Sequence, residues 1–288
     1  MHWRIRITAM LAMVVSLLSV SAQAAATLYA ATGSGGVAGN LYVIDPNSGS
    51  ASVAGPILLG ATPVALTGLA VHPQTGVIYG ATASSDATIP RHLVRITPTG
   101  AVTDIGTLGV SSADIAFSPA GILYMSSGAS GNLFVVNLGS GLATSLGPTS
   151  FGSASGGGLA VTAGNIGLYL PNGASGVLAT LNLTTGAGAA GPALTGAPIA
   201  GGTMNAASVN STGVLYAVNG NFGGGVGNLV TINLTTGAVT NIGTLPPDID
   251  ALAFALGSEG VPTLSEWAMI VMALLLAATG FLAMRRRG

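Results

Sequence analysis

The chain has no cysteine and no lysine, and only 5% of its 288 residues are charged. The absence of cysteine excludes disulfides, thiolate nucleophiles and cysteine-ligated zinc, so packing and backbone pairing must supply the stability. Between residues 25 and 260, two arginines stand against seven acidic residues, which gives a net charge of −5. A surface so poor in cations gains little by neutralising phosphates. This argues against nucleic-acid binding and against attachment of this region to anionic lipid.

Histidine is also scarce, and this limits catalysis. Residues 25–260 contain only His72 and His92, whereas a hydrolase of the triad type needs a nucleophile, a base and an orienting acid. His72 lies in a predicted turn and His92 has no carboxylate beside it in sequence, so both are interpreted as surface residues. The sequence therefore predicts a protein that is not an enzyme, with no catalytic residue, no cofactor and no metal.

What the region does contain is a long internal repeat. Tyrosines recur in steps of 50, 45, 45 and 47 residues, at Tyr29, Tyr79, Tyr124, Tyr169 and Tyr216. A turn glycine recurs in steps of 41 to 51 residues, at Gly49, Gly100, Gly141, Gly186 and Gly237. The tyrosines are interpreted as packing residues between sheets, not as a ladder for stacking carbohydrate.

Each repeat predicts four short strands joined by glycine turns, because glycine takes the positive φ that tight hairpins require. Four strands in about 45 residues are typical of a propeller blade, so residues 25–258 predict an all-β, five-bladed β-propeller. The chain opens with a second strand, 27–32, and closes with a first strand, 249–255. Pairing of these two would complete one blade and close the ring. The alternatives are a β-solenoid and a β-sandwich.

Three polar residues are candidates to face the central channel. Asp114 and Asp250 come just before repeated apolar triplets on the predicted innermost strands, and Asn205 takes the place equivalent to Asp114. Two acids at one channel mouth would suit a secreted propeller enzyme of the glycosidase, lyase or lactonase type. The alternative interpretation is that each acid caps backbone amides. Asp248 and Asp250 would share one face of a strand and suit a cation, but no Asp-x-Asp-x-Asp-Gly calcium loop is present.

The N-terminus predicts export. Arg4 and Arg6 precede an apolar stretch from residue 7 to 20, and Ala22 and Ala24 supply the small-x-small pattern that signal peptidase needs, with cleavage before Ala25. Residues 1–24 are therefore predicted to be a helical signal peptide. The alternative is a retained N-terminal anchor.

The C-terminus predicts a membrane segment with a basic end. Residues 267–284 carry no charge and would span roughly 27 Å as a helix, enough to cross a bilayer core. Arg285, Arg286 and Arg287 follow as a stop-transfer cluster and place this end in the cytoplasm. Just before the helix stands the motif Val261, Pro262, Thr263, Leu264, Ser265, Glu266, Trp267 and Ala268.

This order of motif, apolar helix and arginines resembles the IPTL-CTERM sorting domain, a bacterial signal recognised by an exosortase. The Pro-Thr-Leu-Ser-x-Trp core is intact, while Val261 replaces the usual Ile and Ala268 the usual Gly. The resemblance covers about the last 28 residues and implies that residues 259–288 form a sorting signal. It also implies signal peptidase and exosortase as partners.

The sequence thus predicts an exported protein that passes through the inner membrane transiently by its C-terminal helix and reaches the cell surface or extracellular matrix. There it would act as a non-catalytic binding module for an extracellular polysaccharide or a surface protein. The alternatives are the propeller enzyme above, a plain type I membrane-anchored surface protein, and a structural component of the matrix without a specific ligand.

Overall fold

The computed structural model describes residues 26–152, 157–171, 176–196, 203–220 and 225–255, together with position 273. The strands all belong to one compact unit, Ala26–Leu256. Within the described residues no helix has the length and apolar character to cross a membrane. The predicted signal peptide, sorting motif and arginine cluster lie outside the described residues, as does the predicted membrane helix except for position 273.

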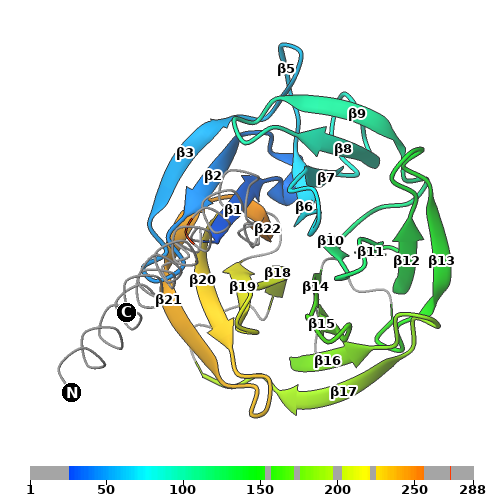
Figure 1. The fold of residues 1–288 in the computed structure, drawn as a ribbon, viewed down its shortest axis with the longest axis vertical. Coiled ribbons are helices and arrows are strands. Elements are labelled where there is room, and N and C mark those ends of the chain that lie inside the picture. Colours follow the sequence, from blue (N-terminus) through cyan, green and yellow to red (C-terminus); the bar gives the residue numbers. More distant parts are fainter. Residues whose placement is uncertain are drawn as a thin grey trace, which may run out of the picture. The chain divides into compact units, whose positions relative to one another are not determined.

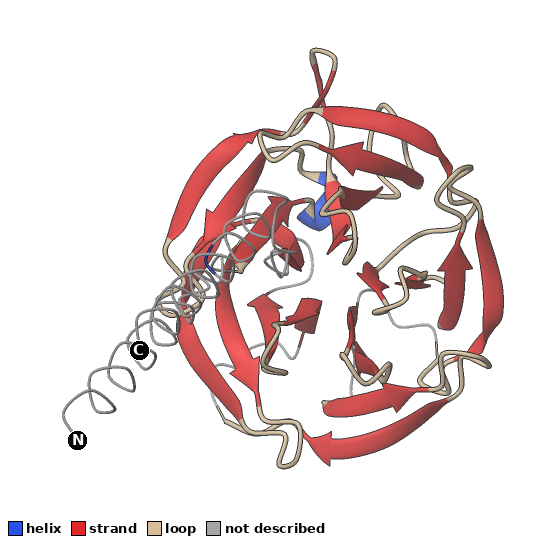
Figure 2. Ribbon diagram, viewed as in Figure 1, coloured by secondary structure: helices blue, strands red, loops and turns tan. Residues whose placement is uncertain are grey.

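Five four-stranded antiparallel sheets form the blades of a propeller (Figures 1 and 2). The all-β, five-bladed prediction is confirmed. Blade 1 comprises β22 (Ile249–Ala255), β1 (Thr27–Thr32), β2 (Asn40–Ile44) and β3 (Ala51–Pro56). Blade 2 comprises β6 (Leu66–Val71), β7 (Ile78–Thr82), β8 (His92–Ile96) and β9 (Val102–Thr107), preceded by a small hairpin of β4 (Leu58–Leu59) and β5 (Thr62–Pro63). Blade 3 comprises β10 (Asp114–Phe117), β11 (Leu123–Ser126), β12 (Asn132–Val136) and β13 (Ala143–Pro148). Blade 4 comprises β14 (Gly157–Val161), β15 (Gly167–Pro171), β16 (Val177–Leu181) and β17 (Gly188–Ala193). Blade 5 comprises β18 (Thr203–Val209), β19 (Leu215–Gly220), β20 (Val226–Ile232) and β21 (Val239–Pro247), and a single 3-10 turn, Ser34–Gly36, follows β1.

The two ends of the described chain close the ring in blade 1. β22 pairs with β1 from Thr27 opposite Ala255 to Thr32 opposite Ile249. Figure 1 shows these first and last strands, dark blue and orange, side by side in one sheet. The predicted pairing of the terminal strands is therefore confirmed. The start of β1 and the end of β22 lie side by side at the same end of blade 1.

The hydrophobic core consists of five clusters, and each cluster fills the space between two neighbouring blades. Tyr79 of blade 2 packs with Ile115 of blade 3, and Tyr216 of blade 5 packs with Phe254 of blade 1. The rings of Tyr216 and Phe254 meet edge to face with their centroids 5.1 Å apart. The periodic tyrosines thus pack between blades, as the repeat predicted.

One tyrosine faces the opposite way from the other four. Tyr124 lies opposite Ala116, but Leu168, and not Tyr169, lies opposite the matching Ala160. Between its innermost strand and its tyrosine, blade 4 has one residue more than blade 3. This extra residue, Gly167, is the first residue of β15 and does not belong to the turn. Because a shift of one residue turns a side chain to the other face of a sheet, Tyr169 packs back against blade 3.

Glycines at the outer rim let the blades touch backbone to backbone. A Cβ on Gly147 of β13 would lie 2.4 Å from the carbonyl oxygen of Thr185 in the outer turn of blade 4. A Cβ on Gly243 of β21 would lie 2.1 Å from the carbonyl oxygen of Ser48 in the outer turn of blade 1. The repeated turn glycines lie on the other side of such contacts: a Cβ on Gly186 would lie 2.5 Å from the Gly147 carbonyl oxygen, and one on Gly237 would lie 2.1 Å from the Ala193 carbonyl oxygen. These turn glycines are therefore required by contact with the neighbouring blade as well as by their positive φ.

Candidate functional site: the central channel

The five innermost strands, β6, β10, β14, β18 and β22, surround the axis of the propeller, and we call the region along this axis the channel (Figure 1). We call the end where these strands begin the entry end, and the end where they turn into the second strands the turn end. Strand pairing aligns one position on each innermost strand, occupied by Gly68, Asp114, Gly158, Ala206 and Ala251. Four of these are small. A Cβ on Gly158 would lie 2.8 Å from the backbone carbon of Ala206, so neighbouring innermost strands approach closely.

Asp114 is the one large side chain in this ring, and it is fully buried. Its Oδ1 accepts a hydrogen bond from the Ile115 amide at 2.9 Å. Its Oδ2 accepts from the amides of Leu159 at 2.9 Å and Ala207 at 3.0 Å. One carboxyl group therefore joins the innermost strands of blades 3, 4 and 5, which is the geometry of a cap on backbone amides.

Burial raises the pKa of Asp114 well above its ordinary value, although the three amide donors oppose this shift and the nearby Asp250 adds to it. Burial also raises the pKa of Asp250 to about 8. No hydrogen bond to the Asp250 carboxyl is found among the described residues. The two acids are thus different, since the buried Asp114 has its oxygens engaged and the half-buried Asp250 does not.

Asp250 and Asn205 occupy the same place in their blades, at bulges near the start of the innermost strands. The pairing of β22 with β1 skips Asp250, and the pairing of β18 with β19 skips Asn205. The predicted equivalence of Asn205 with Asp114 is therefore wrong by one residue, because Ala206 holds that position. Thr67 of β6 is skipped in the same way. A bulge at an equivalent site in three blades sets three polar side chains at the entry end.

Asp248 does not share a strand face with Asp250, contrary to the prediction. It lies between β21 and β22 with a positive φ of 63°, and its Oδ1 accepts a hydrogen bond from the Gly225 amide at 2.8 Å. Asp248 thus belongs to the tight connection between blades 5 and 1.

A cavity of about 330 Å³ opens at the turn end of the channel. It is lined by the ends of all five innermost strands and by the turns that follow four of them, including Gln74, Thr162 and Ser211. Blade 1 contributes Ala253 and Phe254 but no turn, because its equivalent turn is replaced by the two chain ends. None of the lining residues is charged, so the cavity suits an uncharged group.

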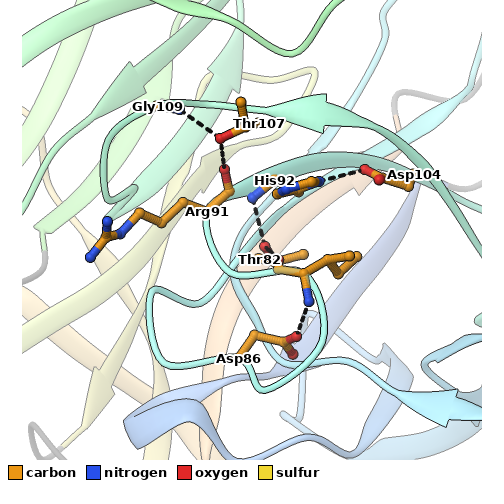
Figure 3. Close-up of polar contacts among 8 residues, drawn as sticks. Thr82, Asp86, Arg91, His92, Asp104, Thr107 and Gly109 are labelled. Atoms are coloured by element: carbon orange, nitrogen blue, oxygen red, sulfur yellow. Dashed lines mark hydrogen bonds and ion pairs between the residues drawn. The ribbon is translucent and has the colours of Figure 1, made fainter.

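A second polar cluster lies in blade 2 (Figure 3). His92 Nδ1 and Asp104 Oδ1 are 2.8 Å apart, both partly exposed on the outer two strands. The sequence analysis did not identify this pair because Asp104 is distant from His92 along the chain and lies on the neighbouring strand of the sheet. Figure 3 shows the Arg91 side chain pointing away from the other residues, and Arg91 has a positive φ of 61°.

Asp86 holds the loop that precedes this pair. Its Oδ1 accepts from the amides of Thr88 and Ile89, and its Oδ2 accepts from the Ala65 amide at 2.8 Å. The Asp-x-Thr spacing is the one sequence signal that would have indicated this buried cap. His72 lies in the turn after β6, where its Nδ1 accepts from the Gln74 amide, and its ring packs on Phe117.

Comparison with known protein families gives a match at residues 260–286. The segment is an IPTL-CTERM motif. This confirms the resemblance predicted from the Pro-Thr-Leu-Ser-x-Trp core. An IPTL-CTERM motif marks an exported, cell-surface-directed protein and implies exosortase-type processing. It stands here on the same chain as a five-bladed propeller.

Similar solved structures show the fold alone. A chain of the Nidogen/Laminin complex has a TM-score of 0.51 and 14% identity, covering 81% of this chain and 99% of that one. A protein of unknown function from Bacteroides thetaiotaomicron has a TM-score of 0.49 and 14% identity, over 68% and 54% of the two chains. Virginiamycin B lyase from Staphylococcus aureus has a TM-score of 0.42 and 14% identity, over 71% and 62%. No curated protein matches the chain.

Proposed function

We propose that this is a cell-envelope or extracellular-matrix protein that an exosortase processes near its IPTL-CTERM motif, and that its propeller acts there as a non-catalytic binding module. The observation that carries the proposal is the position of the motif, which begins at residue 260, five residues after the last strand ends at Ala255. The order along the chain is a folded domain followed directly by a sorting signal. Signal peptidase would remove residues 1–24, and the C-terminal segment would hold the protein in the inner membrane until it is processed.

A binding role suits the channel better than catalysis. The oxygens of Asp114 are already engaged by three backbone amides, and its pKa is raised by burial, so it is neither free nor readily ionised. A two-carboxylate glycosidase needs both acids available to the substrate. The uncharged cavity at the turn end offers a concave surface instead, and we propose it as the place where a polysaccharide or a surface protein is held.

Intact mass of the protein recovered from producing cells tests the processing. The expected mature species begins at Ala25 and ends near the motif, and it is lost when Pro262 and Trp267 are replaced by alanine. Ser258→Ala, which lies outside the matched segment, is the control and should be processed normally. A species that still ends at Gly288 in the unmodified protein would contradict the proposal and leave a plain membrane anchor.

Binding is tested separately, with polysaccharide purified from the same cells. Ser211→Trp places a large side chain at the rim of the turn-end cavity and should reduce retention of the polysaccharide at least tenfold. Thr240→Trp, on an exposed position of β21, should leave retention unchanged. Equal retention by both variants would place binding elsewhere on the propeller.

A further inference from the structure

We propose that the entry end of the channel binds a hard divalent cation of the calcium class, with the Asp250 carboxylate and Asn205 Oδ1 as protein ligands and water completing the coordination. This inference does not depend on the proposed function. It rests on unpaired oxygens, on strand register and on uncompensated charge, all at one end of the molecule.

The first observation is a group of buried oxygens without partners. Within the described ranges, three buried side-chain polar atoms make no hydrogen bond, namely Thr32 Oγ1, Ser112 Oγ and Asn205 Oδ1. All three belong to the entry end. Thr32 ends β1 opposite the first residue of β22, Ser112 lies just before β10, and Asn205 is near the start of β18. Asn205 is only 5% exposed, and an unpaired buried amide oxygen costs about 1–3 kcal/mol unless a water or an ion meets it.

The second observation is register. Asn205 and Asp250 are the extra residues of matching bulges on β18 and β22, and these two strands pack against each other in the ring. Asn205 and Asp250 therefore occupy matching positions near the start of neighbouring innermost strands. Two residues beyond Asn205, the Ala207 amide donates to Asp114 Oδ2, which brings a second carboxylate close to the same place.

The third observation is charge. Asp250 and Asp114 repel each other, and among the described residues no ion pair forms with either acid. The arginines of the propeller, Arg91 and Arg95, belong to blade 2, and Arg95 lies 5.8 Å from the ring centroid of Tyr79. A half-buried carboxylate with no partner is unfavourable when ionised, and a bound cation would reverse this.

The available ligands select the class of cation. The proposed ligand atoms are all oxygens, which hard cations prefer, and the chain has no cysteine for a soft metal. The described residues contain no group of three or more histidine, cysteine, aspartate or glutamate side chains, so neutral oxygens and water must fill most of the shell. A site with so few charges should be weak, with a Kd on the order of 10⁻⁴ to 10⁻³ M, as in extracellular calcium modules.

The test is a calcium titration of the full chain in detergent, by isothermal calorimetry and by thermal unfolding at pH 8.5. With a Kd of about 1 mM, 10 mM CaCl2 should raise the folded-to-unfolded ratio about tenfold. Asp250→Asn should abolish both the calorimetric signal and the calcium response. Without calcium the same variant should be more stable than the unmodified protein, because it removes an unpaired charge.

Two further variants make the outcome decisive. Asn205→Ala should weaken calcium binding at least fivefold. The thermal unfolding of this variant is compared with and without calcium, so that any loss of folding stability caused by the substitution itself cancels. Asp104→Asn, on an exposed acid of blade 2, should change neither calcium binding nor the calcium response. Absence of binding by the unmodified protein, or binding that persists in Asp250→Asn, overturns the proposal.

Discussion

Replacement of Asp114 by alanine should be among the most destabilising single changes in the propeller. The side chain accepts three hydrogen bonds from buried amides of blades 3, 4 and 5. Alanine leaves those three N–H groups unpaired, and at about 1–3 kcal/mol for each the expected loss is roughly 3–9 kcal/mol. Since domains of this kind have a total free energy of unfolding of about 5–15 kcal/mol, the variant should be near the limit of folding.

Asparagine at the same position separates hydrogen bonding from packing. Its amide oxygen can replace Oδ2 and accept from both Leu159 and Ala207, but its NH2 group would face the Ile115 amide, donor against donor. Asp114→Asn should therefore lose about 1–3 kcal/mol, less than Asp114→Ala. The assay is urea unfolding at pH 7, followed by far-UV circular dichroism.

The control for this pair is Asp104→Asn, which changes an exposed acid and should alter the free energy of unfolding by less than about 0.5 kcal/mol. If Asp114→Ala unfolds within the same margin as the control, the carboxyl is not holding the three blades together. If asparagine is as harmful as alanine, the loss comes from the charge or shape of the side chain and not from the number of amides it accepts.

Three further predictions concern the ring as a whole. Gly243→Ala forces a Cβ to within 2.1 Å of the Ser48 carbonyl oxygen and should lower the free energy of unfolding by about 1–3 kcal/mol in the same urea assay. The control is Gly164→Ala, whose Cβ would have its nearest neighbour 3.7 Å away and should change the free energy of unfolding little. Ser208→Ala removes the hydroxyl that accepts the Phe254 amide at 3.0 Å between blades 5 and 1, and should cost about 1–2 kcal/mol in thermal unfolding. In metal-free buffer, the free energy of unfolding should fall as pH rises from about 4 to about 8, by at most about 6 kcal/mol, because the folded state holds the Asp250 proton longer than the unfolded state does. Asp250→Asn should reduce that slope but not remove it, because the pKa of Asp114 is raised as well. An unchanged slope would refute the assignment.

The pH prediction depends on how few titratable groups surround Asp250. The strands packed against β22 are β1, β6, β18 and β19. Of these, β6 and β18 carry no titratable side chain, and β1 and β19 carry only Tyr29 and Tyr216. The other acid in the channel is Asp114 on β10, and the charge of Asp250 adds to the rise of its pKa, whereas burial alone raises the pKa of Asp250.

The fold could be predicted from the sequence because the pattern of one blade occurs five times along the chain. Strand order, blade number and the closure of blade 1 all follow from a period of about 45 residues and from where the chain enters and leaves it. The direction of Tyr169 could not be predicted. Blade 4 takes its extra residue, Gly167, into the strand, whereas blade 2 takes its own into the longer turn between Val71 and Ile78. An extra residue in the strand and an extra residue in the turn give the same spacing between repeats in sequence, so the sequence does not distinguish them.

The candidate site was predicted only in its residues, not in its contacts. Asp114 and Asp250 were identified from their places before apolar triplets, but the amides that Asp114 binds lie 45 and 93 residues away along the chain. The bulges that align Asn205 with Asp250 leave no signature in sequence, since a bulge is a property of the pairing of two strands. For the same reason the His92–Asp104 pair was missed.

Both ends of the propeller, at Thr27 and Ala255, lie beside the turn-end cavity, and this position has a consequence for the processing proposed above. Four residues, 256–259, separate the last strand from the sorting motif, and the five peptide steps across them reach at most about 18 Å. While the processing enzyme is bound to the sorting motif, it and any large ligand would compete for the space at the mouth of that cavity. Under the proposed processing, cutting would therefore come before ligand binding, and the propeller would leave the membrane with this cavity empty.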